Sequence, residues 1–358
     1  MKRMHIAFAF LSTLLLLLSL AYWQINMLLL PVVGIAQYNG VNYAKKEIVI
    51  PLNYSAADIA VLLEEEGIIK SALLFQLYAR YHGYDQHLQA GRYMLNPAMG
   101  LADILEELKQ GVVFKETRRF TIPEGFTMEQ IAARLDAAGL AAADLFKEAS
   151  RQYYNDNFAF LDEIPAGVYH RLEGYLFPDT YEVFPESNAD DIITIMLQRF
   201  AGVFNERYRS RAAELGLTIH EAITLASLIE REGRVREEKP LIAAVFHNRL
   251  KQNMLLQSCA TVQYALGEIR AFLTYADLEI DSPYNTYLYP GLPPGPIASP
   301  SLYALRAALY PAPEDYLYFV SREDGSGAHY FSTTLQEHNR YKALAEHNRK
   351  KYLQHGRE

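Results

Sequence analysis

An uncharged, strongly apolar segment near the N-terminus constrains this chain more than any other feature. It runs from Ile6 to Trp23 without an Asp, Glu, Lys or Arg, and a second apolar run prolongs it from Ile25 to Val33. Because a helix rises 1.5 Å per residue, about 20 such residues cross the hydrocarbon core of a bilayer. The sequence therefore predicts a transmembrane anchor within residues 5–33, after a cytoplasmic tail at residues 1–4.

The charges that flank this segment predict its orientation. Lys2 and Arg3 precede it, and no Lys or Arg follows before Lys45. Positive charge on the N-terminal side alone places that end in the cytoplasm. A cleaved signal peptide is the alternative, although its apolar region would be shorter and Gly34–Ala36 is a weak cleavage site. We expect an uncleaved single-pass anchor, with the rest of the chain outside the cytoplasm after a linker at 34–44.

Composition narrows the classes of protein. The 358 residues are 50 % hydrophobic and 21 % charged, enough for two or three packed domains. A net charge of −8 argues against a nucleic-acid partner. The 26 tyrosines suit sugar-binding clefts, although most are expected to be ordinary core and surface residues. Cys259 is the single cysteine, so no intrachain disulfide can form, and it is more typical of a packing residue than of a nucleophile.

Two stretches repeat the same pattern of strand, turn and amphipathic helix. They begin at Glu47 and Arg118, and a looser echo covers residues 95–111. Ser55 and Thr127 are the expected helix N-caps, and a glycine closes each helix. The pattern resembles LysM modules, which bind cell-wall glycan. A small α/β spacer that binds nothing is an equally open reading of this region, which we place at residues 45–168.

The remainder, residues 169–358, predicts a mixed α+β catalytic domain. Helical periodicity covers residues 190–204, 219–232 and 239–250, and a hairpin is expected at 316–333 around an Asp-Gly turn. A charged helix is expected at 340–353, and Glu-His-Asn-Arg occurs at 337–340 and again at 346–349, which we interpret as a solvated face. No metal or cofactor motif is present, so neither a metal nor a cofactor is expected.

One predicted helix ends in two glutamates, Glu230 and Glu232, followed by Gly233. Ala222, Leu225, Ala226 and Ile229 make one apolar face by their spacing, and Glu232 extends it, whereas Glu230 lies well around the helix. Burial raises the pKa of a carboxyl group, and a protonated glutamic acid is what departure of a glycosidic oxygen requires. Glu232 is therefore the predicted acid and Glu230 the alternative. On a generic helix both would be exposed and paired with neighbouring arginines.

A conventional glycosidase uses two carboxylates. Asp179 is a candidate for the second, but it equally suits a turn cap. One acid/base suffices if the substrate supplies the nucleophile. In murein, the C6 hydroxyl of muramic acid can attack C1 and close a 1,6-anhydro ring.

Five blocks of sequence together resemble the YceG-like family of endolytic murein transglycosylases. The resemblance implies an α+β fold with a membrane anchor, a LysM-like α/β region and a catalytic domain that contains a lysozyme-like acid-bearing helix. The blocks are EGYLFPDTY (173–181), ASLIEREG (226–233), VFHNRL (245–250), YNTYLYPGLPPGPIASP (284–300) and YLYFV (316–320).

The resemblance implies a lytic transglycosylase, a carbon–oxygen lyase that cuts the MurNAc–GlcNAc β-1,4 bond within nascent strands and ends their elongation. It implies the inner membrane, peptidoglycan glycan strands as substrate, and peptidoglycan synthases of the elongation machinery as partners. It also implies a catalytic glutamate in the Glu-x-Glu helix. By analogy with transglycosylases whose acid precedes a small residue at a helix end, that glutamate is Glu232.

The chain departs from the family pattern at one place. Where LQTDPTV is expected, it reads LQSCATV at Leu256–Val262, so Cys259 replaces an acidic residue. The candidates for contacts with sugar in the expected glycan groove are Asn248, Gln257, Thr261, Tyr284, Asn285, Tyr287 and Asp179. For residues of these types in loops, a structural role is at least as common as contact with sugar.

Two other functions stay open on sequence alone. A lysozyme-like hydrolase would admit water and leave no anhydro ends. A non-catalytic scaffold that binds glycan and recruits synthases would not depend on Glu232.

Overall fold

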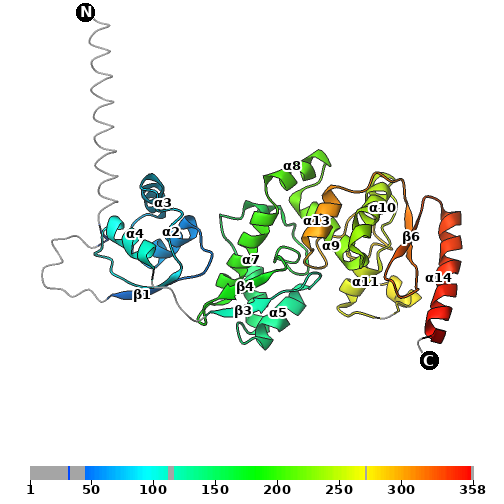
Figure 1. Cartoon of the computed structure of the whole chain (residues 1–358), viewed down its shortest axis with the longest axis horizontal. Helices are drawn as coiled ribbons and strands as arrows, with labels where there is room; N and C mark the ends of the chain where they lie inside the picture. The colour runs from blue at the N-terminus through cyan, green and yellow to red at the C-terminus, as the bar shows by residue number, and fades with distance from the viewer. Residues whose placement is uncertain (1–30, 33–44, 112–116, 271, 356–358) are drawn as a thin grey trace, which may run out of the picture. The chain divides into compact units, whose positions relative to one another are not determined.

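The computed structural model describes residues 31–32, 45–111, 117–270 and 272–355. The chain forms two compact units (Figure 1): a smaller one that ends at Arg118 and takes in Glu182–Ser187, and a larger one made of Arg119–Tyr181 and Asn188–Glu358. Helices predominate and the strands are few and short, so the expected mixed α+β class is confirmed. The predicted tail, anchor and linker lie outside the described residues, except for residues 31–32.

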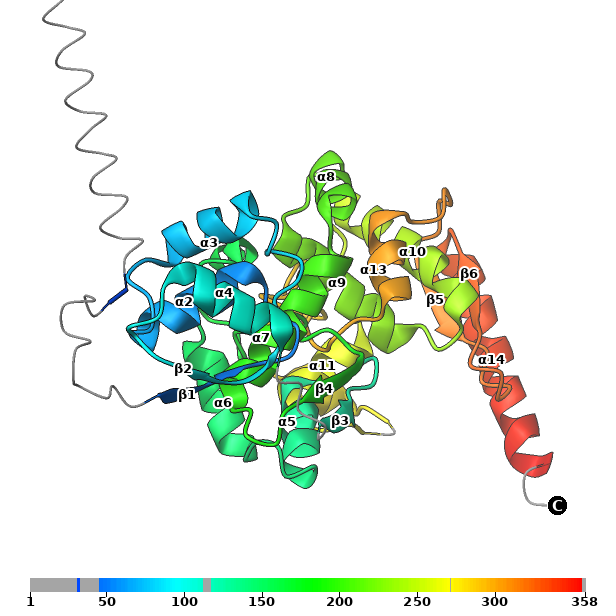
Figure 2. The ribbon, with the colours of Figure 1, turned by 60° about the vertical axis from the view of Figure 1, so that its left-hand side comes forward.

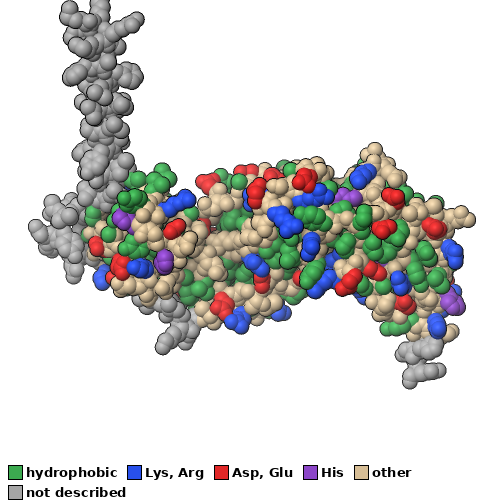
Figure 3. All heavy atoms as spheres, turned by 45° about the horizontal axis from the view of Figure 1, so that its top comes forward, with side chains coloured by type: hydrophobic (Ala, Val, Ile, Leu, Met, Phe, Trp, Pro, Cys, Tyr) green, Lys and Arg blue, Asp and Glu red, His purple; other side chains and the backbone are tan. Residues whose placement is uncertain are grey.

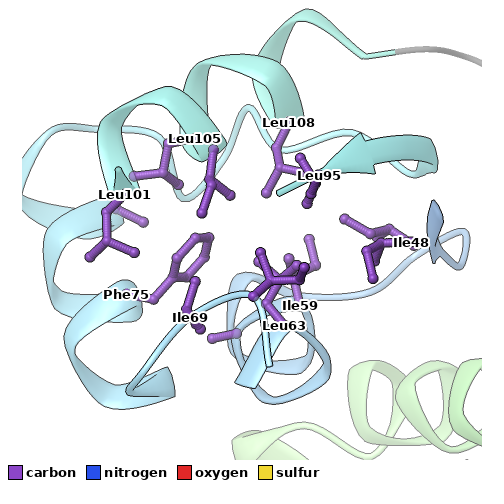
Figure 4. Packing of buried hydrophobic residues seen from close by; sticks show 14 of the residues in the cluster. Ile48, Ile59, Leu63, Ile69, Phe75, Leu95, Leu101, Leu105 and Leu108 are labelled. Carbon is purple, nitrogen blue, oxygen red and sulfur yellow. The ribbon is translucent and has the colours of Figure 1, made fainter. Parts of the chain in front are cut away.

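The smaller unit packs three helices on a two-stranded antiparallel sheet. Ile48 of the first strand pairs with Tyr93 of the second. The N-cap predicted at Ser55 is present as a reciprocal capping box with Asp58. Apolar side chains from all five elements meet in one core, where Phe75 lies among leucines and isoleucines (Figure 4). The elements are β1 (Lys46–Ile50), α2 (Ala56–Glu65), α3 (Ala72–Tyr81), β2 (Gly91–Leu95) and α4 (Leu101–Gln110).

The second copy of the repeat belongs to the larger unit. Its strand β3 (Arg118–Thr121) pairs with β4 (Thr180–Val183), and its helix α5 (Met128–Ala137) packs on α6 (Ala143–Gln152). Thr127 forms the predicted capping box. The division between compact units falls at 118/119, because this copy buries its apolar face against later parts of the chain, and the expected domain boundary at 168/169 stays a prediction.

The remaining elements of the larger unit include α9, the helix that carries the two glutamates. They are η2 (Ala159–Glu163), α7 (Ala189–Val203), α8 (Glu206–Glu214), α9 (Ile219–Glu232), η3 (Arg236–Glu238), α10 (Lys239–Lys251), α11 (Cys259–Leu266), α12 (Tyr275–Leu278), α13 (Leu302–Leu309), β5 (Tyr318–Ser321), β6 (His329–Ser332) and α14 (Leu335–His355).

Helix α9 is enclosed on all sides. It packs against α8, α10, α11, α13 and η2, and each residue from Ala222 to Ile229 is buried. The expectation of a single apolar face was wrong, because the turn at Gly174 and the loop at Ile297 cover the side of Ile223 and Ser227 as well. Helical periodicity therefore does not separate Glu230 from Glu232, and their contacts must. Within the part of the chain that the structure describes, no single helix is long and apolar enough to span a membrane, and one bent pair, α8 with α9 at 91°, passes that test jointly.

The predicted hairpin is present and is covered by the last helix. Phe319 of β5 pairs with Phe331 of β6, and α14 packs on both strands (Figure 2). Helix α14 begins at Leu335, earlier than the expected residue 340, because its first turn is also polar and matches no apolar period.

The turn at Gly174 requires a glycine. Its φ of +81° lies in the left-handed region, and an added Cβ would come within 2.5 Å of Pro296 Cβ and 3.0 Å of Ile223 Cγ2. This glycine lets the backbone next to Glu173 approach α9.

We expect Gly174→Ala to lower the free energy of unfolding by about 3 kcal/mol, because backbone strain of about 1–2 kcal/mol adds to overpacking of about 1–3 kcal/mol. Thermal denaturation of the two variants Gly174→Ala and Gly216→Ala provides the comparison. Gly216 has a φ of +71° with nothing within 4 Å of an added Cβ, so its variant should show the strain alone. Equal effects of the two substitutions would contradict the close packing.

Candidate active site

Glu232 lies at the floor of a cleft in the larger unit. It is the last residue of α9, and the helix ends where the Gly233 N–H donates to the Ile229 carbonyl at 2.9 Å. The cleft has a volume of about 570 Å³. Its walls come from the β5–β6 hairpin, from the last turns of α14 and from Phe272. The acid predicted from sequence therefore faces a hollow wide enough for sugar rings.

The carboxylate of Glu232 takes the place of a helix cap. Ser258 is the N-cap residue of α11, but its side chain does not cap the helix. Its hydroxyl instead donates to Glu232 Oε1, and the N–H of Ala260 in the first turn of α11 donates to the same carboxylate. An N-cap side chain normally accepts such a first-turn N–H, so Glu232 fills that role from another helix.

Two opposing influences determine the acidity of Glu232. Burial raises the pKa of its carboxyl group above the ordinary glutamate value, because the ionised form loses hydration. The hydrogen bonds from Ser258 and Ala260, and the charges of His329 and Arg231, lower it in part. Burial prevails, so the group stays protonated to a higher pH than an exposed glutamate and can act as a general acid.

Ser258 is itself held by two threonines. Its N–H donates to Thr286 Oγ1 at 3.0 Å, and its carbonyl accepts from Thr261 Oγ1 at 2.8 Å. The two threonine hydroxyls lie 2.9 Å apart. Thr261, a predicted sugar contact, is fully buried and supports the partner of Glu232 instead.

Glu230 has a different environment. Its carboxylate forms an ion pair with Lys239 at 2.9 Å, with both side chains nearly buried (7 % and 10 % exposed). It also accepts the N–H of Ser301 at 3.1 Å and the hydroxyl of the same residue. The cleft lining does not include Glu230. Its contacts join the end of α9 to the starts of α10 and α13. Among the described residues, neither Glu230 nor Glu232 forms the ion pair with an arginine that is expected of exposed glutamates.

A histidine–glutamate pair next to Glu232 was missed by sequence reasoning. His329 lines the cleft, and its Nδ1 lies 2.8 Å from Glu238 Oε2. The backbone N–H of His329 donates to the same carboxylate at 3.0 Å. Because an ionised carboxylate only accepts hydrogen bonds, the ring nitrogen next to it, Nδ1, carries a proton. The sequence showed His329 only as part of a strand, and no local pattern links it to Glu238.

Three predicted groove residues have structural contacts. Asn285 is fully buried and donates to the carbonyls of Leu278 and Ile280, both at 2.9 Å. Asn248 donates to the carbonyls of Glu314 and Tyr316, and Tyr284 is buried with its hydroxyl 3.4 Å from the Tyr169 N–H. These side chains hold loops around the site.

Asp179 is not a second carboxylate for Glu232. It forms an ion pair with Arg199 at 2.6 Å and accepts the N–H of Thr180 at 2.7 Å. These are the contacts of a turn residue, the alternative that the sequence left open, and Asp179 does not line the cleft.

Gln257, Cys259 and Tyr287 form an accessible edge near Glu232. Gln257 is exposed, in a left-handed backbone conformation with a φ of 50°. The thiol of Cys259 lies 3.1 Å from the hydroxyl of Tyr287. Burial and, to a smaller extent, the charge of Glu232 raise the pKa of that thiol. Of the predicted groove residues, Gln257 and Tyr287 keep positions that suit sugar contact.

A second hollow of about 760 Å³ in the larger unit contains Glu173, which sequence analysis placed only within a motif. Both of its oxygens lie 3.0 Å from the Met128 N–H at the start of α5, and the Tyr264 hydroxyl donates at 3.1 Å. Burial raises the pKa of Glu173 to about 7. Its oxygens are engaged in fixing α5. Among the described residues, no cluster of three His, Cys, Asp or Glu side chains has the geometry of a metal site.

Comparison with known proteins agrees with this geometry. A protein of Bacillus subtilis (strain 168) named endolytic murein transglycosylase is 38 % identical over 309 residues, which are 82 % of each chain. One of the same name from Streptococcus pneumoniae (strain D39) is 35 % identical over 321 residues, 83 % of this chain but 57 % of the relative, so the chain spans just over half of that protein.

A crystal structure of a Listeria monocytogenes protein, titled a putative YceG-like protein, is 37 % identical in sequence. The likeness covers 83 % of this chain and 98 % of that one, with a TM-score of 0.55. The model of the YceG-like family matches residues 48–344. The chain therefore belongs to the YceG-like family.

Proposed function

We propose that this protein is an endolytic murein transglycosylase with Glu232 as its single acid/base. The observation that carries the proposal is a partly buried carboxyl group of raised pKa that opens onto a cleft of about 570 Å³. The Bacillus subtilis relative, named for this activity, supports it over most of both chains. The proposed substrate is the β-1,4 bond from MurNAc to GlcNAc within a peptidoglycan strand.

The proposed reaction uses Glu232 twice. Its protonated carboxyl group first donates to the glycosidic oxygen as the bond from C1 of muramic acid breaks. The resulting carboxylate then takes the proton of the C6 hydroxyl as O6 forms its bond to C1. The products are a 1,6-anhydromuramyl end and a GlcNAc end, no water is consumed, and Glu232 regains its proton.

Ser258 and Ala260 stabilise the form of Glu232 that exists between these two steps. Both donate to the carboxylate, and neither has to move when the proton leaves. The other carboxylate in the cleft, Glu323, lies on the exposed hairpin turn and lacks comparable burial. A single buried acid favours the substrate's own hydroxyl as nucleophile over water, and hence a lyase over a lysozyme-like hydrolase.

We also propose that residues 5–33 anchor the chain in the inner membrane, with the LysM-like segment and the catalytic part in the periplasm, beside peptidoglycan synthases. Lys2 and Arg3 before an uncharged apolar run support this topology. The capped strand–helix pattern of the smaller unit supports a LysM-like module.

Replacing Glu232 by Gln should reduce cleavage by about 10²–10⁴-fold, because the acid is lost and the shape is kept. The measurement is mass spectrometry of anhydromuramyl ends released from peptidoglycan. In the matched control, Glu230→Gln, Lys239 is left buried without its partner at a cost of about 3–5 kcal/mol. That variant should unfold at a lower temperature yet cleave when folded. Persisting anhydro ends with Glu232→Gln would refute the assignment, and reducing muramyl ends from the wild type would indicate a hydrolase.

Replacing Ser258 by Ala should move the alkaline limb of the pH profile of kcat/KM to higher pH. The hydroxyl of Ser258 lowers the pKa of Glu232, so its loss raises that pKa, and a general acid stays protonated further up the scale. Ser301→Ala removes the same kind of donor from Glu230 and should leave the limb in place. A shift to lower pH with Ser258→Ala would contradict the proposed role of Glu232.

The topology is tested with alkaline phosphatase fused after residue 45, which should be active only if that point lies outside the cytoplasm. Deleting residues 4–33 should leave the fusion inactive and the protein in the soluble fraction. An active phosphatase in the deletion variant would contradict the anchor.

A further inference from the structure

The cleft above Glu232 contains two arginines that the proposed reaction does not use. Arg234 follows Glu232 by two residues, and Arg349 projects from α14. The chain carries a net charge of −8, and acidic and basic side chains are interspersed on the face shown in Figure 3. The same lining holds two carboxylates, Glu232 and Glu323, so what needs an explanation is the contacts of the two guanidinium groups rather than their number.

Neither arginine is held there by an acidic partner. Among the described residues, no carboxylate lies within ion-pair distance of Arg234 or Arg349. Arg349 instead stacks on Phe272, with its guanidinium carbon 4.7 Å from the ring centroid. The stem of Arg234 lies along the hairpin turn, where Cβ and Cδ are 3.4 and 3.5 Å from the position of a Cβ on Gly327. The ring of Phe272 orients Arg349, whereas Arg234 lies next to the backbone at Gly327, and neither is held by a carboxylate, so both keep N–H donors for a ligand.

The neighbouring groups fit an anionic ligand. Tyr352 lies one turn after Arg349 on the same face of α14 and also lines the cleft. The negative charge of Glu238 is engaged by His329, and Glu238 does not line the cleft. Glu323, on the exposed turn, offsets one of the two arginines at most. A planar guanidinium pairs best with a carboxylate, to which it can donate two parallel hydrogen bonds.

The position of these arginines relative to the acid points to the part of the substrate they meet. Cα atoms two residues apart lie within about 7 Å, so Arg234 is close to the bond that Glu232 cleaves. Muramic acid differs from its neighbour in the strand by a lactyl group on C3. That group ends either in its own carboxylate or in a stem peptide that carries carboxylates.

We propose that Arg234 and Arg349 bind a carboxylate on the lactyl substituent of the muramic acid at the scissile bond. This inference rests on the proposed transglycosylase function. It makes the pair a specificity determinant: the cleft distinguishes murein from an uncharged β-1,4 glycan by charge, and it fixes which sugar places its C1 above Glu232.

The test measures kinetics of the full-length protein in detergent on three strand preparations. The first keeps its stem peptides, and the second is stripped by an amidase to the free lactyl carboxylate. The third has its carboxyl groups neutralised by coupling to methylamine. We expect neutralisation to raise the wild-type KM about tenfold or more, with a smaller effect on kcat. The difference in KM between neutralised and charged strands should decrease at high salt. The preparation with the lower KM of the first two identifies which carboxylate is bound.

The variants are Arg234→Gln with Arg349→Gln, and Arg234→Lys with Arg349→Lys. The glutamine pair should bring the ratio of KM between neutralised and charged strands close to one, and the lysine pair should restore part of it. Lys350→Gln is the matched control, because Lys350 makes the same charge change on the same turn of α14 but pairs with Glu346 outside the cleft. It should keep the wild-type ratio.

A wild-type KM that does not change on neutralisation would overturn the proposal, as would a glutamine pair that keeps the wild-type ratio. Should the double variant not fold, Arg234→Gln alone must still lower the ratio, since Arg234 is exposed. Failure of the proposed function is a separate result: the wild type would then release no anhydromuramyl ends from any of the three preparations.

Discussion

The hydrogen-bonded contact between the carboxyl group of Glu232 and the start of α11 is the interaction on which the rest of the site depends. The enclosed helix α9 takes the carboxyl group out of water, which favours the protonated form. The Ser258 hydroxyl and the Ala260 N–H favour the ionised form. The acid/base role that we propose for Glu232 needs both forms within reach, and this contact favours each of them in part.

Many polar side chains near the site support this contact and do not line the cleft. Thr261 and Thr286 hold Ser258, and Asn285 holds the loop that carries Thr286. On the other side, Glu238 ties the first residue of β6 to the segment that follows α9. A carboxyl group works as an acid/base only if its partners stay in place, so the surroundings consist largely of positioning residues.

What could be predicted from the sequence was local. The capping boxes at Ser55 and Thr127, the hairpin around its Asp-Gly turn and the position of Glu232 at a helix end all depend on residues a few positions apart. What could not be predicted depends on distant segments. Ser258 and His329 come to the site from later elements, and the second repeat copy joins the larger unit through hydrogen bonds of Gly125 to Ser299 and of Met128 to Glu173. The helical wheel failed on α9 because periodicity cannot reveal that a helix is covered on every side.

The walls of the cleft have a consequence for when the site comes into existence. Glu232 ends α9, whereas the hairpin and the turns of α14 that enclose it are made much later in the chain. During synthesis of the chain, Glu232 is therefore present before the segments that form the walls of the cleft. The cleft is complete only after the hairpin and the last turns of α14 have folded against the rest of the larger unit.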